Sequence, residues 1–194
     1  LIRVGADRQR RAGQLQQAGK LERGAHRGVN SWIFGTERCA PWLDLGLVSQ
    51  FSTIHDLIEA ECGDTNTLAM GEAGKVDKAR REAKALEVIR ERFVALPYIA
   101  ETIDRYESLA DPEARFVKVL DKALPRLTHA LNGGVALREQ GIGLEAVTRI
   151  NGAQDIEIGS TYGADQSEAM QLLVAAHREL AARFEAKPAT AAPL

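Results

Sequence analysis

A histidine and several carboxylates interrupt the apolar stretch from Phe51 to Thr65. Residues three and four apart share one face of a helix, so His55 and Glu59 should lie on the face of Phe51, with Asp56 one step round the helix. An ionised carboxylate is very costly to bury unless a metal ion or another cation compensates its charge. We therefore predict that this helix lies against a cation, with a metal ion as the first candidate.

Asp121 is a second acid on an apolar face, in a helix expected from Pro112 to about Leu131. The apolar residues of that face are Val117, Leu120, Leu124, Leu127 and Leu131. A salt bridge to lysine or arginine would explain one buried acid, but two such helices favour a shared metal site. A nitrogen ligand together with carboxylate oxygens suits a borderline or hard divalent cation, which leaves Mn, Mg, Co and Zn open.

The elements that must position these residues are helices. A helix with Asp44 as its N-cap and Gly63 as its stop signal should carry His55. Further helices are expected over residues 75–94, 98–109, 112–131, 144–150 and 165–185, with residues 151–164 as a loop that includes a brief extended piece at 156–158. No alternating strand pattern persists, so we predict an all-α fold, a helical bundle.

The composition excludes several classes of partner. The 194 residues include 25 basic and 27 acidic side chains, and the formal net charge is -2, so no overall field draws the protein to nucleic acid or to a membrane. No apolar run approaches the roughly 18 residues of a transmembrane helix, and no start resembles a signal peptide. The two cysteines form no disulfide pattern. We expect a cytoplasmic protein, and a homodimer is compatible with the sequence.

We expect three segments along the chain: a basic, poorly structured arm over residues 1–36, a helical domain over residues 37–185 and a disordered tail over residues 186–194. The arm is rich in arginine and glycine and begins with Leu1 instead of methionine. Clustered positive charge can bind phosphates, whereas a frayed terminus is the simpler interpretation.

The pair His55-Asp56 is followed by Glu59 and by Gly63-Asp64-Thr65, and the segment from Glu113 to Lys122 comes later in the chain. Together these motifs resemble the HD-domain metal-dependent phosphohydrolases. The resemblance runs from about Trp42 to Gly134 and is nearest to the bacterial and phage proteins similar to 5'-deoxynucleotidases. It implies an HD-domain helical bundle that hydrolyses phosphomonoesters, with a small nucleotide, a (deoxy)nucleoside 5'-monophosphate, as the expected substrate.

Carried over residue by residue, the resemblance makes His55, Asp56 and Asp121 ligands of the divalent ion. Glu59 matches the acid that activates water, and Asp64 matches an acid that holds water or substrate. Basic groups near such a site could bind the phosphate, and the candidates are Lys122, Lys78, Arg81 and His129. For the three cations a solvated surface position is the simpler explanation, and for His129 a position at the edge of the core is equally compatible.

The first metal ligand of the family is a histidine on an earlier helix, and this chain departs from that pattern. His26 stands 29 residues before His55, but its glycine-rich surroundings are a poor helix. Three hypotheses remain: a divergent member that uses His26, a member that has lost one ligand, or a chain whose residues 1–36 are not native family sequence. A non-catalytic HD-like module that binds a nucleotide or a partner is the rival to the enzyme, and a basic-arm nucleic-acid binder ranks last.

Overall fold

The computed structural model describes residues 40–63 and 72–185. Within these ranges the chain forms α-helices joined by turns, with no strand, which confirms the predicted all-α class. The predicted arm (residues 1–36), the tail (residues 186–194) and the site candidates His26 and Asp64 lie outside the described residues. The segment boundaries therefore stay predictions.

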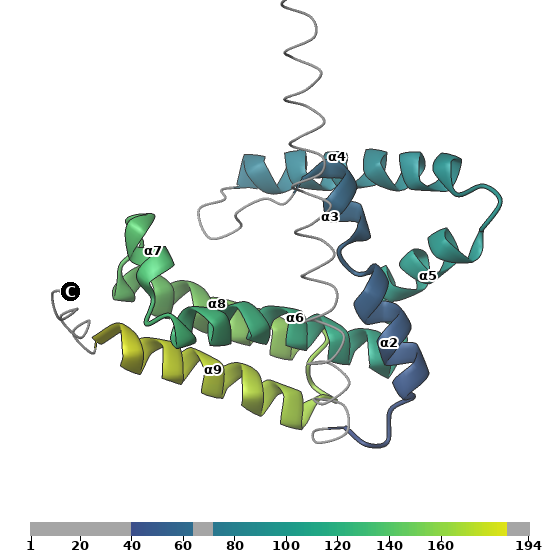
Figure 1. Ribbon diagram of the computed structural model, residues 1–194. Helices are drawn as coiled ribbons and strands as arrows, with labels where there is room; N and C mark the ends of the chain where they lie inside the picture. Colours follow the sequence, from purple (N-terminus) through teal and green to yellow (C-terminus); the bar gives the residue numbers. More distant parts are fainter. Residues whose placement is uncertain (1–39, 64–71, 186–194) are drawn as a thin grey trace, which may run out of the picture. The chain divides into compact units, whose positions relative to one another are not determined.

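The described residues divide into two compact units, which we treat one at a time. Unit one covers residues 45–63 and 72–103, and unit two covers residues 40–44 and 104–185. Unit one contains α2 (Leu45–Ile54), α3 (Leu57–Cys62) and α4 (Glu72–Arg92), and unit two contains α6 (Pro112–Leu131), α7 (Val135–Glu139), α8 (Leu144–Thr161) and α9 (Ser167–Glu185) (Figure 1). The remaining helix, α5 (Tyr98–Glu107), belongs to unit one up to Ile103 and to unit two from Asp104.

In unit one the single helix expected from Asp44 to Gly63 is wrong, because the helix is interrupted at His55 and Asp56. Asp56 has φ -95° and ψ 3°, outside the helical region, and α3 starts again at Leu57. The amide of His55 still bonds to the carbonyl of Phe51, so α2 is complete up to the interruption. The shared face that the spacing predicted for His55 and Glu59 therefore does not run unbroken from one helix to the next.

Unit two is a group of helices around α6 and α9, which lie alongside each other, with α8 packed against α9 (Figure 1). The buried residues of α9 follow a spacing of four, three and four: Ala169, Leu173, Ala176 and Leu180. A repeat of about 3.5 residues is the pattern of a helix that packs along a neighbouring helix. Phe116, Val119 and Leu120 of α6 are equally buried and form the other side of this core.

The predicted bounds of α6 are confirmed, but its buried face lies elsewhere than expected. Leu131 is exposed, and Leu124 and Leu127 are half-buried, whereas Phe116, Ala123 and Arg126 are buried. Asp111 stands at the N-cap position before Pro112, but its carboxylate makes no cap and instead accepts two hydrogen bonds from Arg105, at 2.7 and 2.8 Å. Pro125 lies inside the helix and has no N–H for the carbonyl of Asp121, four residues earlier.

The loop expected over residues 151–164, with its extended piece at 156–158, is wrong because α8 continues to Thr161. Asn151, Gly152 and Gly159 have low helix propensity, which is why the pattern predicted an early end. Val147, Asn151 and Ile158 are buried where α8 packs against α9. This tertiary burial outweighs the weak local preference.

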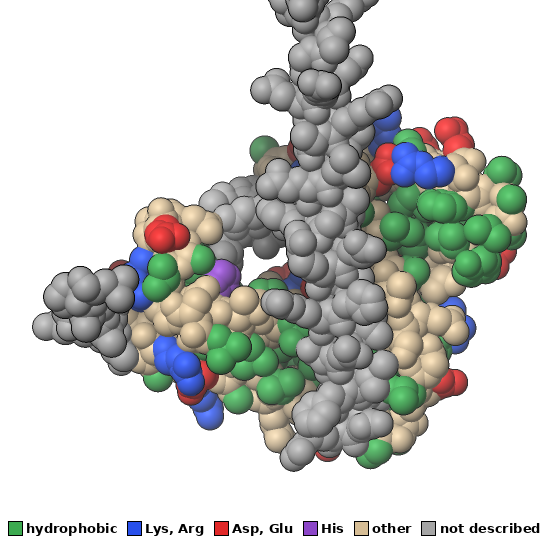
Figure 2. Space-filling view, in the orientation of Figure 1, with side chains coloured by type: hydrophobic (Ala, Val, Ile, Leu, Met, Phe, Trp, Pro, Cys, Tyr) green, Lys and Arg blue, Asp and Glu red, His purple; other side chains and the backbone are tan. Residues whose placement is uncertain are grey.

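Few large apolar side chains of unit one are strongly exposed, and three of them gather where α4 turns into α5. These are Val94, Leu96 and Tyr98, in the region where Figure 2 shows apolar side chains collected on the surface.

Among the described residues no helix combines the length and the apolar character needed to cross a lipid bilayer.

Candidate functional site

His55 of unit one is held by a bond to its own helix. Its Nδ1 lies 2.8 Å from the carbonyl oxygen of Ser52, and a carbonyl only accepts, so Nδ1 carries the proton and donates. In a continuous helix that carbonyl would receive the N–H of Asp56, four residues on. The imidazole takes this acceptor at the point where the helix is interrupted. This hydrogen bond to the Ser52 carbonyl also sets the orientation of the ring, so that Nε2 is the nitrogen that could bind a cation.

Asp56 directs its carboxylate at this second nitrogen. Oδ1 of Asp56 lies 3.1 Å from Nε2 of His55, although an aspartate at a helix N-cap would ordinarily accept from the first helical N–H groups. Asp56 makes no such cap bond to α3. Its side chain is 56% exposed and that of His55 14%, so the expectation of a buried carboxylate is wrong for Asp56. The interruption between the helices turns the aspartate outward.

The pair fits a divalent cation. Two ligand atoms 3.1 Å apart are compatible with one ion when each lies about 2.1 Å from it. An imidazole nitrogen with a fixed tautomer and a carboxylate oxygen are ligands that Mn, Co and Zn accept, and Mg accepts the carboxylate more readily than the imidazole. The donor set thus matches the cation that the sequence predicted for these two residues.

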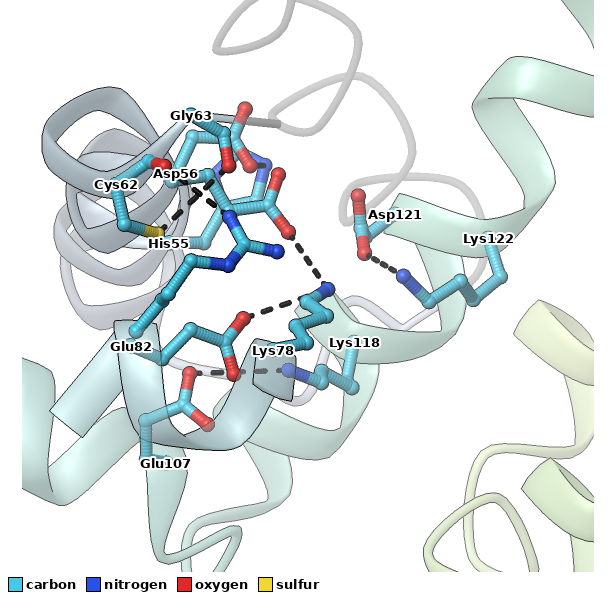
Figure 3. Close-up of polar contacts among 12 residues, drawn as sticks. His55, Asp56, Cys62, Gly63, Lys78, Glu82, Glu107, Lys118, Asp121 and Lys122 are labelled. Carbon is cyan, nitrogen blue, oxygen red and sulfur yellow. Dashed lines mark hydrogen bonds and ion pairs between the residues drawn. The ribbon is translucent and has the colours of Figure 1, made fainter. Parts of the chain in front are cut away.

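Glu59, the predicted water-activating acid, lies on α3 and is tied to α4 through Lys78. Nζ of Lys78 lies 3.2 Å from Oε1 of Glu59 and 3.3 Å from Oε1 of Glu82. Figure 3 shows the contact between Lys78 and Glu82. Burial by itself would lower the pKa of Lys78, but the hydrogen bonds and charges of the two glutamates outweigh it and raise that pKa. The lysine is therefore a fixed positive charge beside Glu59, and its predicted contact with a substrate phosphate stays a prediction.

Arg81, the other cation predicted on this helix, closes the end of α3. It donates from Nη1 to the carbonyl of Cys62 at 3.2 Å and from Nε to Asp77 at 3.1 Å. Carbonyls at the end of a helix lack intrahelical partners, so this bond stabilises the C-terminus of α3. Burial raises the pKa of the Cys62 thiol beside it, with a smaller contribution in the same direction from Glu82. A phosphate contact for Arg81 stays a prediction as well.

Asp121, the predicted distal ligand, lies in unit two on α6 and is half-buried. Its Oδ2 accepts a hydrogen bond of 2.6 Å from Nζ of Lys122, which Figure 3 also shows. Lys122 was predicted to contact the substrate and here balances the charge of its neighbour. Burial, with the charge of Asp121 as the next cause, raises the pKa of Tyr162 to about 12. The carboxylate of Asp121 thus acts on two neighbouring groups within its unit.

His129 lies in the last turn of α6 and is half-buried. Within the described part of the chain its buried Nδ1 has no hydrogen-bond partner. Burial lowers the pKa of His129, so its imidazole is neutral near pH 7. This position agrees with a histidine at the edge of the core, and a role in substrate binding stays a prediction.

A second histidine–aspartate pair occurs in unit two, and the sequence did not indicate it. Nδ1 of His177 lies 3.1 Å from Oδ2 of Asp155. The other oxygen of Asp155 accepts from Arg126, whose side chain is only 4% exposed and also donates to Gln154. These groups come from α6, α8 and α9, so no local spacing could have placed them together.

Two further residues of unit one contact the candidate site residues and were not predicted from the sequence, although each carries a local signal. Ser52 precedes His55 by three residues, the separation at which a side chain reaches a helical carbonyl. Glu82 follows Lys78 by four residues, the spacing of an intrahelical ion pair. Both signals were too common in helices to indicate a site without the structure.

Comparison with known proteins supports the resemblance. A family model described as an HD domain matches residues 31–160, more than half of the chain. No curated protein and no solved structure matches the chain. HD domains are in general metal-dependent phosphohydrolases that bind divalent cations, and the predicted family is confirmed at that level. The matched range includes His55, Asp56, Glu59 and Asp121, and the chain therefore belongs to the HD-domain family.

Proposed function

We propose that this protein is a divalent-metal-dependent phosphohydrolase that cleaves phosphomonoesters, with (deoxy)nucleoside 5'-monophosphates as its substrates. The observation that carries the proposal is the convergence of Nε2 of His55 and Oδ1 of Asp56, 3.1 Å apart, at an interruption between two helices. Neither helix regularity nor capping explains this arrangement. Asp56 occupies the N-cap position of α3, but its carboxylate makes no cap bond and faces the imidazole instead. Binding a cation explains both features.

In this proposal His55 and Asp56 hold the ion, and Asp121 supplies the distal ligand that the family resemblance implies. The bound ion would neutralise charge on a phosphoryl oxygen and lower the pKa of a water molecule. The chain's own residues orient these ligands: the Ser52 carbonyl fixes the ring of His55, and Lys122 pairs with Oδ2 of Asp121.

Glu59 acts as the proton acceptor in the proposed reaction. Oε1 of Glu59 is bonded to Lys78, so we assign Oε2 as the atom that takes the proton from the attacking water. The water oxygen forms a bond to phosphorus as the ester P–O bond breaks, and the proton passes from Glu59 to the departing alkoxide. The products are inorganic phosphate and an alcohol, which for a nucleotide is the nucleoside.

The substrate class rests on the resemblance to 5'-deoxynucleotidase-like proteins. The formal net charge of -2 provides no general attraction for a polyanion, which favours a small phosphate ester over a nucleic acid. A small substrate needs only local cations, and Lys122, Lys78 and Arg81 are the candidates.

The test is a metal analysis combined with a phosphatase screen on the full chain. After dialysis against Mn or Co, the protein should retain a divalent ion and release phosphate from deoxynucleoside 5'-monophosphates. Asp121→Ala should lose the ion and the activity together, whereas Glu59→Ala should keep the ion and turn over about a hundredfold more slowly.

Retention of the ion by both variants, or its loss in both, would contradict these roles. A wild-type protein that holds no ion and leaves all the nucleotides intact would instead identify the chain as a non-catalytic HD-like binding module.

A further inference from the structure

We propose that Lys78 is a positioning residue that holds the carboxylate of Glu59 in the orientation needed to accept a proton from water. This inference rests on the proposed function, because it assigns a support to the proposed general base. Lys78 is on α4 and Glu59 on α3, and both belong to unit one. Nothing in their sequence spacing, 19 residues apart, indicates the contact.

The geometry of Lys78 is that of a fixed link between two acids. Its Nζ lies 3.2 Å from Oε1 of Glu59 and 3.3 Å from Oε1 of Glu82, and its side chain is 24% exposed. Figure 3 shows Lys78 directed at Glu82. A lysine with two carboxylate partners has little freedom to leave either one. Because Oε1 of Glu59 is engaged by Lys78, rotation of the carboxylate is restricted and Oε2 keeps a defined direction.

The charges at this contact also favour the role. A general base accepts a proton in its ionised form, and Oε1 of Glu59 lies 3.2 Å from the ammonium of Lys78. Glu82 shares the ammonium, so the three groups carry a net charge of about -1 and Lys78 does not fully neutralise Glu59. The lysine can therefore orient the base without removing its ability to take a proton.

Unit one contains a matched control for this contact. Arg92, also on α4, forms a bidentate ion pair with Glu61 of α3 at 2.6 and 3.0 Å. Both cations therefore tie α3 to α4 through a glutamate, and the two glutamates are two residues apart. Glu61 has no part in the proposed chemistry, so loss of Arg92 reports only the loss of a link between the helices.

A direct contact of Lys78 with the substrate phosphate is the alternative that the experiment must separate. A cation that binds the substrate equally in the ground state and the transition state changes KM and leaves kcat unchanged. A residue that positions the base changes kcat and leaves KM unchanged. Measuring both constants therefore distinguishes the two roles.

The experiment compares Lys78→Met, Lys78→Gln, Lys78→Arg and Arg92→Met in the full chain, with Mn or Co and a deoxynucleoside 5'-monophosphate. We expect Lys78→Met and Lys78→Gln to lower kcat about tenfold or more, with KM and metal content unchanged. Lys78→Arg should recover part of that loss, and Arg92→Met should keep kcat within about twofold of wild type. Adding Lys78→Met to Glu59→Gln should lower kcat no further, because the base is already absent.

Three results with the variants would overturn the proposal. A rise in KM at unchanged kcat would make Lys78 a substrate ligand, and equal losses in Lys78→Met and Arg92→Met would make it a general link between α3 and α4. Unchanged kinetics in Lys78→Met would exclude any role in turnover. A wild-type protein without phosphatase activity at saturating metal refutes the proposed function itself, and the role of Lys78 with it. Circular dichroism and thermal melting of each variant identify any loss of activity that comes from unfolding.

Discussion

Two histidine–aspartate pairs occur among the described residues, one in each unit, and their surroundings differ. His55 and Asp56 of unit one are neighbours in the chain, and the exposed carboxylate faces a nitrogen whose ring is fixed by the Ser52 carbonyl. His177 and Asp155 of unit two come from α9 and α8, and each has a side chain that is 15% exposed. Asp155 is also bonded to the buried Arg126, whereas the side chain of Asp56 is 56% exposed.

This difference separates an exposed pair from a pair that is joined to a buried cation. In unit two the guanidinium of Arg126 supplies the positive charge, so a metal ion would have to displace a buried partner. In unit one the imidazole and the carboxylate converge near the surface, where the side chain of Asp56 is exposed. The same two residue types therefore serve structure in one place and, as we propose, chemistry in the other.

The largest effect should come from removing the two histidines one at a time. His55→Ala should lose the bound ion, and the loss of several kcal/mol of transition-state stabilisation corresponds to about a thousandfold in kcat. His177→Ala should keep the ion and most of the activity but melt at a lower temperature. Elemental analysis, steady-state kinetics and thermal melting measure the three quantities. Loss of the ion in His177→Ala would show that the two pairs do not differ in role.

The next effect concerns stability. Arg126→Met leaves Asp155 half-buried without its main cation, and we expect the free energy of unfolding to fall by about 3 kcal/mol. Asp56→Asn removes an exposed charge, so its cost should stay below about 1 kcal/mol. Urea denaturation of both variants in metal-free buffer gives the two values. If Asp56→Asn were the more destabilising change, the pair in unit one would be the structural one.

A smaller effect should be visible by nitrogen NMR of the two imidazoles. Both histidines should carry a proton on Nδ1, because this atom faces the Ser52 carbonyl in His55 and the Asp155 carboxylate in His177. Addition of Zn should shift the Nε2 resonance of His55 and leave that of His177 in place. His55→Ala assigns the signal. Equal shifts in both rings would remove the distinction between the pairs.

The smallest effect uses Tyr162 as a reporter of the charge on Asp121. Burial first, then the charges of Asp121 and Glu157, raise the pKa of Tyr162 from 10.0 to about 12. Between these pH values the unfolded chain has lost a phenol proton that the folded protein keeps, so stability falls as the pH rises. Asp121→Asn should lower the pKa of Tyr162, measured by ultraviolet absorbance with Tyr162→Phe to identify the signal. An unchanged pKa would mean that Lys122 cancels the charge of Asp121 at this distance.

Much of the fold could be predicted from the sequence because helix signals are local. The proline after Asp111 predicted the start of α6, and Asn132 followed by glycines predicted its end. The local signal failed in α8, where Gly152 and Gly159 indicated a loop and burial against α9 decided for a helix. It also failed at His55, where one side-chain bond to Ser52 competes with the helical pattern.

The sequence by itself determined the all-α class, the HD family and the identity of His55, Asp56, Glu59 and Asp121 as candidates, because these depend on residue type, order and spacing along the chain. The tertiary structure alone decided which charges meet: Lys78 with Glu59, and Arg126 with Asp155. The physical reason is that an ion pair depends on distance in space, and residues 19 or 29 positions apart come within hydrogen-bond distance only after their helices have packed. In this protein such contacts distinguish the exposed pair of His55 and Asp56 from the pair of His177 and Asp155, which is bonded to the buried Arg126.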